Sequence, residues 1–131
     1  MKNFPDSHRD LLTSGKRAFV YLATLTSSGW PQVTPVWFDT EGDYLRINSA
    51  EGRLKDRNMR ARPRVAVCIA DPDNPYRYVQ VRGRVVEITK EGATQHINDL
   101  SQKYRGEPYD LQPGQVRVIY KILPEKLDVH G

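Results

Sequence analysis

The sequence predicts a mainly β domain: a small barrel of six to seven antiparallel strands with helices on its outside. Its 131 residues match a single domain covering residues 1–131, since domains have about 100–200 residues. Strand patterns dominate the first two thirds of the chain, and only two helical segments interrupt them. The first three strands are joined by turns too short for the crossover that parallel strands need. These observations favour an antiparallel barrel over a parallel α/β sheet.

The first three strands are expected to form a meander. Residues 17–26 are rich in β-branched and aromatic types and end in a turn that contains Gly29. Residues 32–39 have the composition of a second strand, in which Pro35 has no N–H to donate. This proline implies a sheet edge, a bulge, or backbone left open for a ligand. Residues 44–48 alternate as a third strand after a short hairpin turn.

The rest of the chain combines helices with longer strands. We expect a helix over residues 52–61, a buried strand over 64–70 and a long strand over 76–89. A second helix over 89–105, a long strand over 115–122 and a short strand over 126–129 follow. Pro63 ends the first helix because it keeps Arg62 out of the helical region. Gly83 permits a bend or bulge in its strand. The apolar run of residues 64–70 is typical of a buried strand, so Cys68 is expected in the core.

Composition excludes several classes of protein. The longest apolar run, residues 19–25, is far shorter than the roughly 20 residues of a membrane-spanning helix, so no membrane association is expected. The amino terminus is charged and interrupted by Pro5, unlike a signal peptide, so we expect a cytoplasmic protein. The single cysteine excludes an internal disulfide framework and a zinc site built from several thiolates.

The net positive charge of +4 comes from one segment. Residues 46–64 contain seven basic and two acidic side chains, a net charge of +5, which leaves −1 for the rest of the chain. Such a segment has three candidate partners: nucleic acid, a phosphorylated cofactor, or solvent alone. Nucleic-acid binders spread basic residues over several elements, with aromatic residues among them. The concentration of charge therefore argues against nucleic acid.

A strand-to-helix junction inside this segment has the features of a phosphate site. The strand ends at Asn48 and Ser49, and the chain turns through Gly52 into the helix. A helix start presents free N–H groups and the positive end of the helix dipole. Arg53 and Lys55, in the first turn, can reach back toward an anion held there. A capped helix with a solvated basic face explains the same residues equally well.

Together these features resemble a known family. The matching pattern is a β-hairpin, a strand, a basic helix start and a second strand, carried by Gly29, Pro31, Pro35, Val36, Trp37, Phe38, Asn48, Ser49, Arg53, Lys55, Arg57, Asn58, Pro63, Arg64 and Val65. This pattern is similar to that of the split β-barrel flavin and deazaflavin oxidoreductases, the superfamily of pyridoxamine 5′-phosphate oxidase. The resemblance covers residues 8–129. It is strongest for a short bacterial branch whose members are mostly predicted to bind the deazaflavin coenzyme F420.

The resemblance implies a fold of the FMN-binding split barrel type, and it assigns residues to a cofactor site. The phosphate would be bound after the third strand, by Arg53 and Lys55 with Asn48, Ser49, Arg57 and Asn58 beside them. The isoalloxazine or deazaflavin ring would lie against the second strand, along Val33, Thr34, Pro35, Val36 and Trp37. The family is also dimeric, with cofactor sites shared between subunits. The partner's contribution is expected from the long strand, from Tyr76, Tyr78 and Gln80.

The resemblance is compatible with three related functions. The first is an F420-dependent oxidoreductase that transfers a hydride to or from a small unsaturated or aromatic substrate. The second is an FMN-binding oxidase or reductase, and the third is a cofactor-binding protein without turnover. Extra cations at Arg57, Arg60 and Arg62 would suit the anionic tail of F420, although a solvated helix face also explains them. Pyridoxamine 5′-phosphate oxidases proper have a carboxy-terminal Arg-x-His segment, which this chain lacks.

No side chain is expected to act as a catalytic residue, because in such enzymes the cofactor carries the hydride. The three histidines, His8, His96 and His130, are expected on the surface. Trp37 and Phe38 are neighbours in one strand, so only one of them can face the barrel interior. Tyr104 is expected to belong to the end of the second helix rather than to the cofactor site.

Overall fold

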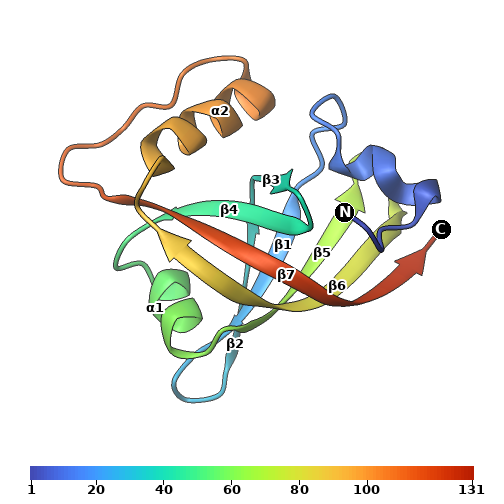
Figure 1. Cartoon of the computed structure of the whole chain (residues 1–131), viewed down its shortest axis with the longest axis horizontal. Coiled ribbons are helices and arrows are strands. Elements are labelled where there is room, and N and C mark those ends of the chain that lie inside the picture. Colours follow the sequence, from blue (N-terminus) through green and yellow to red (C-terminus); the bar gives the residue numbers. More distant parts are fainter.

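The computed structural model describes residues 1–131 as one curved antiparallel sheet with three helices around it (Figure 1). In chain order the elements are η1 (Asp6–Leu12), β1 (Val20–Leu25), β2 (Pro31–Val36), β3 (Phe38–Glu41), β4 (Tyr44–Ala50), α1 (Leu54–Ala61), β5 (Arg64–Asp71), β6 (Asn74–Thr89), α2 (Ala93–Arg105) and β7 (Arg117–His130). The seven strands lie in the order β2-β1-β5-β6-β7-β4-β3. The prediction of a mainly β, split antiparallel barrel is confirmed. The short 3-10 helix η1 was not predicted.

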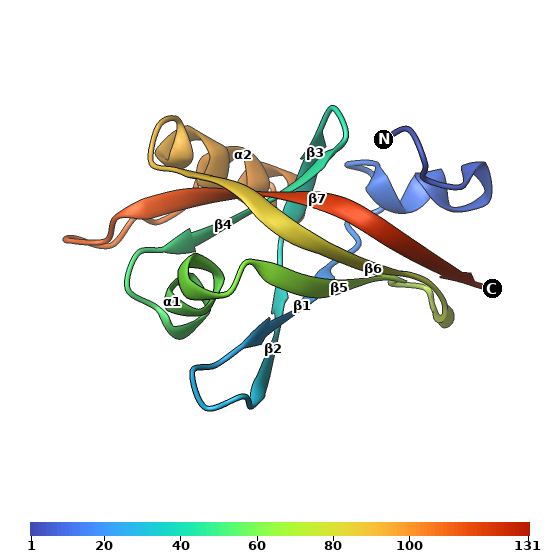
Figure 2. The same cartoon turned by 60° about the horizontal axis from the view of Figure 1, so that its bottom comes forward.

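The two edge strands of the sheet are consecutive in the chain. Val36 at the end of β2 pairs with Val20 of β1, whereas Phe38 at the start of β3 pairs with Ile47 of β4. Only Trp37 separates the two edges, so the sheet curls until the chain itself connects them (Figure 2). Of the three possibilities that Pro35 implied, the structure shows the first, because β2 is an edge strand.

Both hairpins of the predicted meander are confirmed, but its middle strand is wrong. Residues 32–39 form two strands in place of one, and β3 and β4 pair with each other at the edge opposite β1 and β2. The strand that follows β1 in the sheet is β5, which pairs with β1 over Val20 to Ala23. The chemistry of a short turn predicts a local hairpin, but it carries no information about which distant strand completes a sheet.

Two strands are predicted over residues 115–122 and 126–129, but the structure has the single strand β7, which begins at Arg117. Gly83 of β6 lies opposite Pro124, where the register between the two strands shifts. A Cβ on Gly83 would lie 2.3 Å from the carbonyl oxygen of Leu123, so a side chain does not fit there. A bulge tolerates a proline inside a long strand, and the predicted irregularity at Gly83 is confirmed.

The core fills the inside of the barrel with alternate residues of each strand. The largest fully buried side chains include Phe38, Tyr120, Leu22, Ile47 and Ile69. Trp37 points away from this core while Phe38 is fully buried, as their adjacency predicted.

The prediction that Cys68 lies in the core is wrong, because β5 buries only one face. Val65, Val67 and Ile69 face inward, whereas Cys68 is half-buried on the outer face. A continuous apolar run is typical of a strand covered on both faces. Small residues on the outer face, Ala66 and Ala70, produced that run.

The helices cover different parts of the barrel. Helix α2 lies across β4 and β7, and α1 packs near β1 (Figure 1). Helix η1 lies beside the end of β7, where the imidazole Nε2 of His8 is 2.9 Å from the carbonyl oxygen of His130. His8 is buried, so its predicted surface position is wrong, whereas His130 is exposed. None of the helices combines the length and the apolar character needed to cross a membrane.

Candidate functional site

A cleft of about 200 Å³ opens between the β1–β2 hairpin, the start of α1, and α2. One side of the cleft is apolar and the other carries positive charge. Its lining residues are Phe19, Pro35, Val36, Trp37, Asn48, Arg53, Lys55, Ile97, Leu100, Tyr109 and Arg117. We call this site the cation cleft.

Three cations meet in the cation cleft, and none of them has an acidic partner. No carboxylate lies within ion-pair distance of Arg53, Lys55 or Arg117. Burial, followed by repulsion from Arg53 and Arg117, lowers the pKa of Lys55. Burial is also the main cause of a lowered pKa at Arg117, with Arg53 adding repulsion. A bound anion would supply the opposite charge that the folded chain does not provide.

Arg117 is the most buried of the three, with 6% of its surface exposed. Its Nε donates to the side-chain oxygen of Asn48 at 2.8 Å, and one Nη donates to the hydroxyl of Tyr109 at 3.4 Å. The guanidinium carbon lies 5.1 Å from the centre of the Tyr109 ring. A guanidinium has five N–H donors, so donors of Arg117 remain available toward the cleft.

Three backbone N–H groups of the turn that leads into α1 are used inside the fold. The N–H of Glu51 donates to the carbonyl of Val116 at 2.8 Å, and that of Gly52 donates to the Asp56 carboxylate at 2.9 Å. The N–H of Arg53 donates to Ala50 at 3.4 Å. The prediction that these turn amides stay free is wrong, because the turn and Asp56 use them. No side chain caps the start of α1, so the N–H groups of its first turn remain available to an anion beside the charged side chains.

The structure brings together about half of the predicted site residues. Pro35, Val36 and Trp37 line the apolar side of the cation cleft, while Asn48, Arg53 and Lys55 line the charged side. Val33 and Thr34 lie on the same edge strand but outside the cleft, and Val33 is 63% exposed.

Three predicted residues near α1 do not line the cleft. Ser49 is fully buried on the opposite face of β4 from Asn48, and its hydroxyl has no hydrogen-bond partner. Asn58 is buried and donates to the Thr24 hydroxyl at 3.0 Å, so it ties α1 to β1. Arg57 is exposed and forms no ion pair.

Two of the extra cations, one on α1 and one directly after it, are used inside the fold. Arg60 donates to Asp56 at 2.9 Å and lies 3.8 Å from Glu51. Arg62 donates to the carbonyl of Leu25 at 2.7 Å. Only Arg57 of the three remains free for a long anionic ligand.

Tyr78 and Gln80 lie on the outer face of the barrel. Tyr78 stacks on His130, with ring centres 4.7 Å apart. Gln80 is exposed and lines a separate hollow of about 370 Å³ with Arg82 and Lys126. Neither residue lines the cation cleft of its own chain.

Sequence reasoning missed the residues that enter the cation cleft from distant segments. These are Phe19, Ile97, Leu100, Tyr109 and Arg117. The first four residues of β7 are all buried, Arg117 among them, but in the sequence Arg117 occupies an ordinary polar position of an alternating strand. The others come from ordinary apolar positions or from a loop, and nothing in their pattern distinguishes them from core or surface residues.

His96 is buried behind the cation cleft, so its predicted surface position is wrong. Its Nδ1 lies 3.1 Å from the side-chain nitrogen of Asn48, and its Nε2 lies 3.0 Å from the Asp39 carboxylate. Burial acts to raise the pKa of Asp39, but hydrogen bonds from His96 and Arg46 outweigh it and lower this pKa below its usual value. The surface prediction failed because α2 packs this histidine onto β3 and β4.

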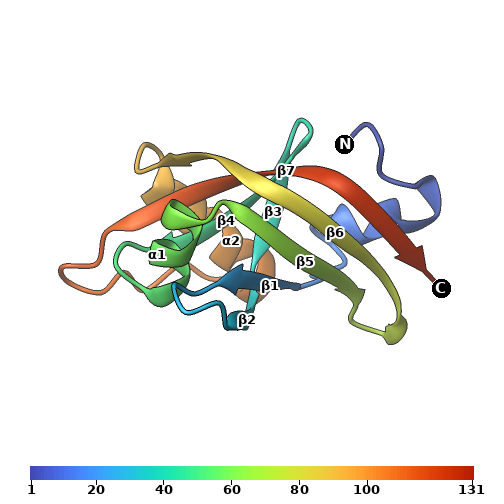
Figure 3. The same cartoon turned by 90° about the horizontal axis from the view of Figure 1, so that it is seen from below.

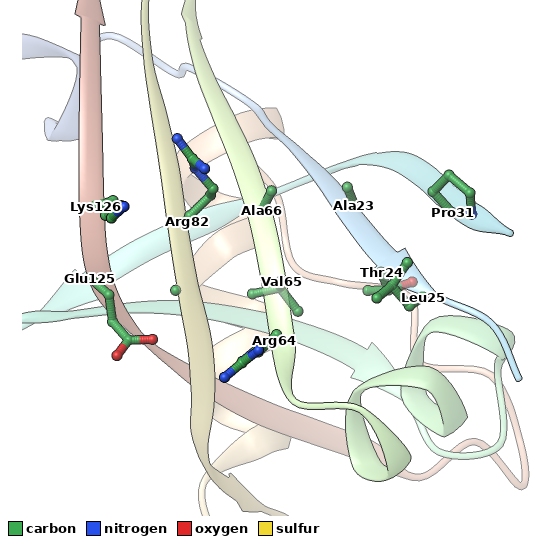
Figure 4. Close-up of a pocket in the computed structure, with 11 residues that line it drawn as sticks. Ala23, Thr24, Leu25, Pro31, Arg64, Val65, Ala66, Arg82, Glu125 and Lys126 are labelled. Atoms are coloured by element: carbon green, nitrogen blue, oxygen red, sulfur yellow. The ribbon is translucent and has the colours of Figure 1, made fainter. Parts of the chain in front are cut away.

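A hollow of about 660 Å³ lies on the outer face of β1, β5, β6 and β7 (Figure 4). These four strands lie side by side in Figure 3. Small residues form its floor, Ala23, Ala66 and Gly83 among them, and charged residues such as Arg82 and Glu125 stand at its rim. This face continues across the hairpin, since Ala23 pairs with the exposed Val33. It offers an apolar surface next to the edge strand that borders the cation cleft.

Comparison with known proteins adds a family to this geometry. Residues 4–131 match the model of the family described as pyridoxamine 5′-phosphate oxidase. A solved structure named F420 reductase is 35% identical, with a TM-score of 0.83 over 95% of this chain and 98% of that one. No curated protein matches the chain.

Two more distant structures share the fold. A conserved hypothetical protein from Mycobacterium tuberculosis is 22% identical, with a TM-score of 0.75 over 97% of this chain and 84% of that one. HupZ of Group A Streptococcus is 18% identical, with a TM-score of 0.69 over 96% and 93% of the two chains. The chain therefore belongs to the pyridoxamine 5′-phosphate oxidase family, whose split barrel carries flavin and deazaflavin oxidoreductases.

Proposed function

We propose that this protein is an F420-dependent oxidoreductase that transfers a hydride between the deazaflavin and a small unsaturated or aromatic substrate. The observation that carries the proposal is the cation cleft, where Arg53, Lys55 and Arg117 meet without an acidic partner beside Trp37. The structure named F420 reductase, 35% identical to this chain, supports the choice of deazaflavin.

The chain's own residues fit a phosphorylated ring cofactor. Arg53, Lys55 and Arg117 would bind the phosphate, and Asn48 would hold Arg117 in place. The edge strand β2 would support the ring along Val33, Thr34, Pro35, Val36 and Trp37. Arg57, which is free of ion pairs, would meet the anionic tail. Ser49 and Asn58 would act from beneath the site, by shaping the end of β4 and anchoring α1.

The bound cofactor supplies the hydride, so the protein needs no nucleophile of its own. What the chain contributes is position: the cations fix the phosphate, and the apolar side of the cleft excludes water from the ring. We assign no catalytic residue to the chain. The substrate would bind over the ring as a small molecule.

We also propose that the protein works as a homodimer with shared cofactor sites. The cation cleft of one chain holds about 200 Å³, less than the roughly 300–1,000 Å³ of pockets that enclose such ligands. The ring would therefore extend over the exposed face of β2, beside the apolar outer face. A second copy on that face would cover the ring, with Tyr78 and Gln80 contributed by the partner subunit.

One observation favours FMN as the alternative cofactor. Arg60 and Arg62 are bound within the fold, which leaves Arg57 as the single free cation of α1 beyond the cleft for a long anionic tail. FMN has a phosphate and no such tail, so the same three cations would suffice. An FMN-binding oxidase or reductase, or a cofactor carrier without turnover, would have the same cleft.

Titration of the purified protein with F420 and with FMN, followed by fluorescence at low ionic strength, tests the proposal. We expect F420 to bind about tenfold or more tightly than FMN, a difference of roughly 1.4 kcal/mol. Binding of FMN alone would overturn the choice of deazaflavin in favour of the alternative. Binding of neither coenzyme would contradict both.

A further inference from the structure

A line of hydrogen bonds leads from β3 to the cation cleft through the buried side of α2. It begins at the Asp39 carboxylate, 3.0 Å from Nε2 of His96. Nδ1 of His96 lies 3.1 Å from the side-chain nitrogen of Asn48, and the side-chain oxygen of Asn48 accepts from Nε of Arg117 at 2.8 Å. His96 and Asn48 are 3% and 7% exposed, so water does not replace these contacts.

The two ends of this line fix the orientation of the Asn48 amide. The side-chain nitrogen of Asn48 also donates to the carbonyl oxygen of Ala93 at 2.9 Å, and a carbonyl can only accept. Arg117 can only donate. The amide nitrogen must therefore face Ala93 and His96, and the amide oxygen must face Arg117. A flipped amide would lose both bonds.

The amide in turn fixes the proton of His96. Because the Asn48 nitrogen donates toward Nδ1, this ring nitrogen must be an acceptor without a proton. The single ring proton then sits on Nε2 and is donated to Asp39. Arg46 holds Asp39 from the other side through two hydrogen bonds of 2.9 and 2.8 Å. Every polar atom in this line of hydrogen bonds has a suitable partner only when His96 is neutral.

We propose that His96 is a positioning residue for Arg117. Neutral His96 keeps the Asn48 amide oriented so that Arg117 faces the cation cleft. Protonation of His96 disrupts this orientation and weakens anion binding. A second proton can enter only at Nδ1, where it meets the N–H of Asn48. Relief requires the amide to turn or to move away, and Arg117 then loses its acceptor. The inference rests on the proposed role of the cleft in phosphate binding and adds a proton-sensitive control to it.

The charged groups around His96 act in opposite directions. Asp39 on β3 attracts a proton to the ring, while Arg46 on β4 and Lys103 on α2 already offset its charge. Asp99 on α2 lies near Arg46, and Arg117 on β7 stands at the far end of the line. An anion bound to Arg117 in its held position would, by linkage, favour neutral His96.

Sulfate is the probe for the test, because it stays a dianion through the whole range in which a histidine titrates. Sulfate affinity would be measured between about pH 5.5 and 8 by NMR shifts of the Arg117 side chain, for the wild type and for His96→Gln. A glutamine can accept from Asn48 and donate to Asp39 without titrating. We expect the wild type to lose about tenfold in affinity on protonation of His96, as for a lost hydrogen bond to a charged group, and His96→Gln to change much less.

A second measurement does not depend on any variant or on a cofactor. The ring-nitrogen NMR spectrum of the wild type should show His96 with its proton on Nε2 at the upper end of that pH range. A proton on Nδ1, or equal pH dependence of sulfate affinity in wild type and His96→Gln, would overturn the inference. Failure to bind F420 and FMN would refute the proposed function. The sulfate affinities and the tautomer of His96 would still test the positioning role of His96.

Discussion

The indole of Trp37 lies flat against the phenol ring of Tyr104, with ring centres 5.3 Å apart and planes 5° apart. Trp37 is the single residue between the two edge strands, and Tyr104 belongs to the last turn of α2. The Tyr104 hydroxyl also donates to the carbonyl of Ala18 and accepts from the N–H of Phe38 at 3.4 Å. Helix α2 thereby closes the split of the barrel and holds the apolar side of the cation cleft.

Removal of the Tyr104 hydroxyl should therefore destabilise the fold. Tyr104→Phe keeps the ring on Trp37 but leaves the Ala18 carbonyl and the Phe38 N–H without their partner, at a cost of about 1–3 kcal/mol. Urea unfolding measures this change. Tyr76→Phe is the matched control, because Tyr76 is 84% exposed and should change stability very little. Equal stability of the two variants would contradict the role of Tyr104.

A methyl group at Gly83 should disturb the bulge that bends β6 over β7. Gly83→Ala places its Cβ 2.3 Å from the Leu123 carbonyl oxygen, and such overpacking costs about 1–3 kcal/mol or more. Gly15→Ala is the control, since nothing lies within 4 Å of its Cβ position. We expect a lower melting temperature for the first variant alone. A neutral result at Gly83 would mean that the strands can separate there without loss.

Charge on the outer face should separate the proposed dimer. Ala66→Arg introduces a guanidinium on the apolar floor of the 660 Å³ hollow, where a second copy would have to bury it. Analytical ultracentrifugation should show a dimer for the wild type and a monomer for Ala66→Arg, with weaker cofactor binding by the monomer. Ala61→Arg, on the exposed end of α1, is the control. A monomeric wild type would contradict the shared-site proposal.

Acid should weaken the fold partly through Asp56. Burial acts to raise the pKa of this carboxyl, but hydrogen bonds from Tyr120, Gly52 and Arg60 outweigh it, so the folded pKa lies below the ordinary value of 3.8. The unfolded chain binds the proton first, so this stabilisation is present above pH 3.8 and is lost as the pH falls below it.

Asp56→Asn tests this contribution. The variant should be less stable than the wild type at neutral pH, and the difference should shrink as the pH falls below 3.8. Urea unfolding at several pH values measures both. Asp110→Asn, in the exposed loop before β7, is the control and should follow the wild type. A difference that stays constant into acid would show that Asp56 acts by shape rather than by charge.

The positions of the strands along the chain could be predicted from the sequence more reliably than the pairing of those strands in the sheet. Alternation and turn residues located almost every strand, because these signals are local. The pairing of β1 with β5, and the break at Trp37, depend on how a sheet of seven strands curls. Cys68 shows the same limit, since an outer face of small residues has the composition of a buried strand.

In the candidate site, too, some residues could be predicted from the sequence and others could not. Arg53, Lys55 and Asn48 lie within a few residues of one another, so their charge and spacing were readable. Arg117 and Tyr109 reach the cation cleft from the far end of the chain, and His96 reaches Asn48 only because α2 packs on β4. No local pattern relates those segments, and only the folded chain brings them together.

The most direct test of the central claim is the F420 affinity of Lys55→Met beside the wild type and Lys2→Met. Lys55→Met removes one cation of the cleft and also relieves repulsion, so its free energy of unfolding should not fall. We predict that its affinity for F420 drops about 10- to 100-fold, as for a lost charged hydrogen bond, while the exposed control Lys2→Met binds as the wild type does. Unchanged F420 affinity in a folded Lys55→Met variant would contradict the assignment of the cation cleft as the phosphate site.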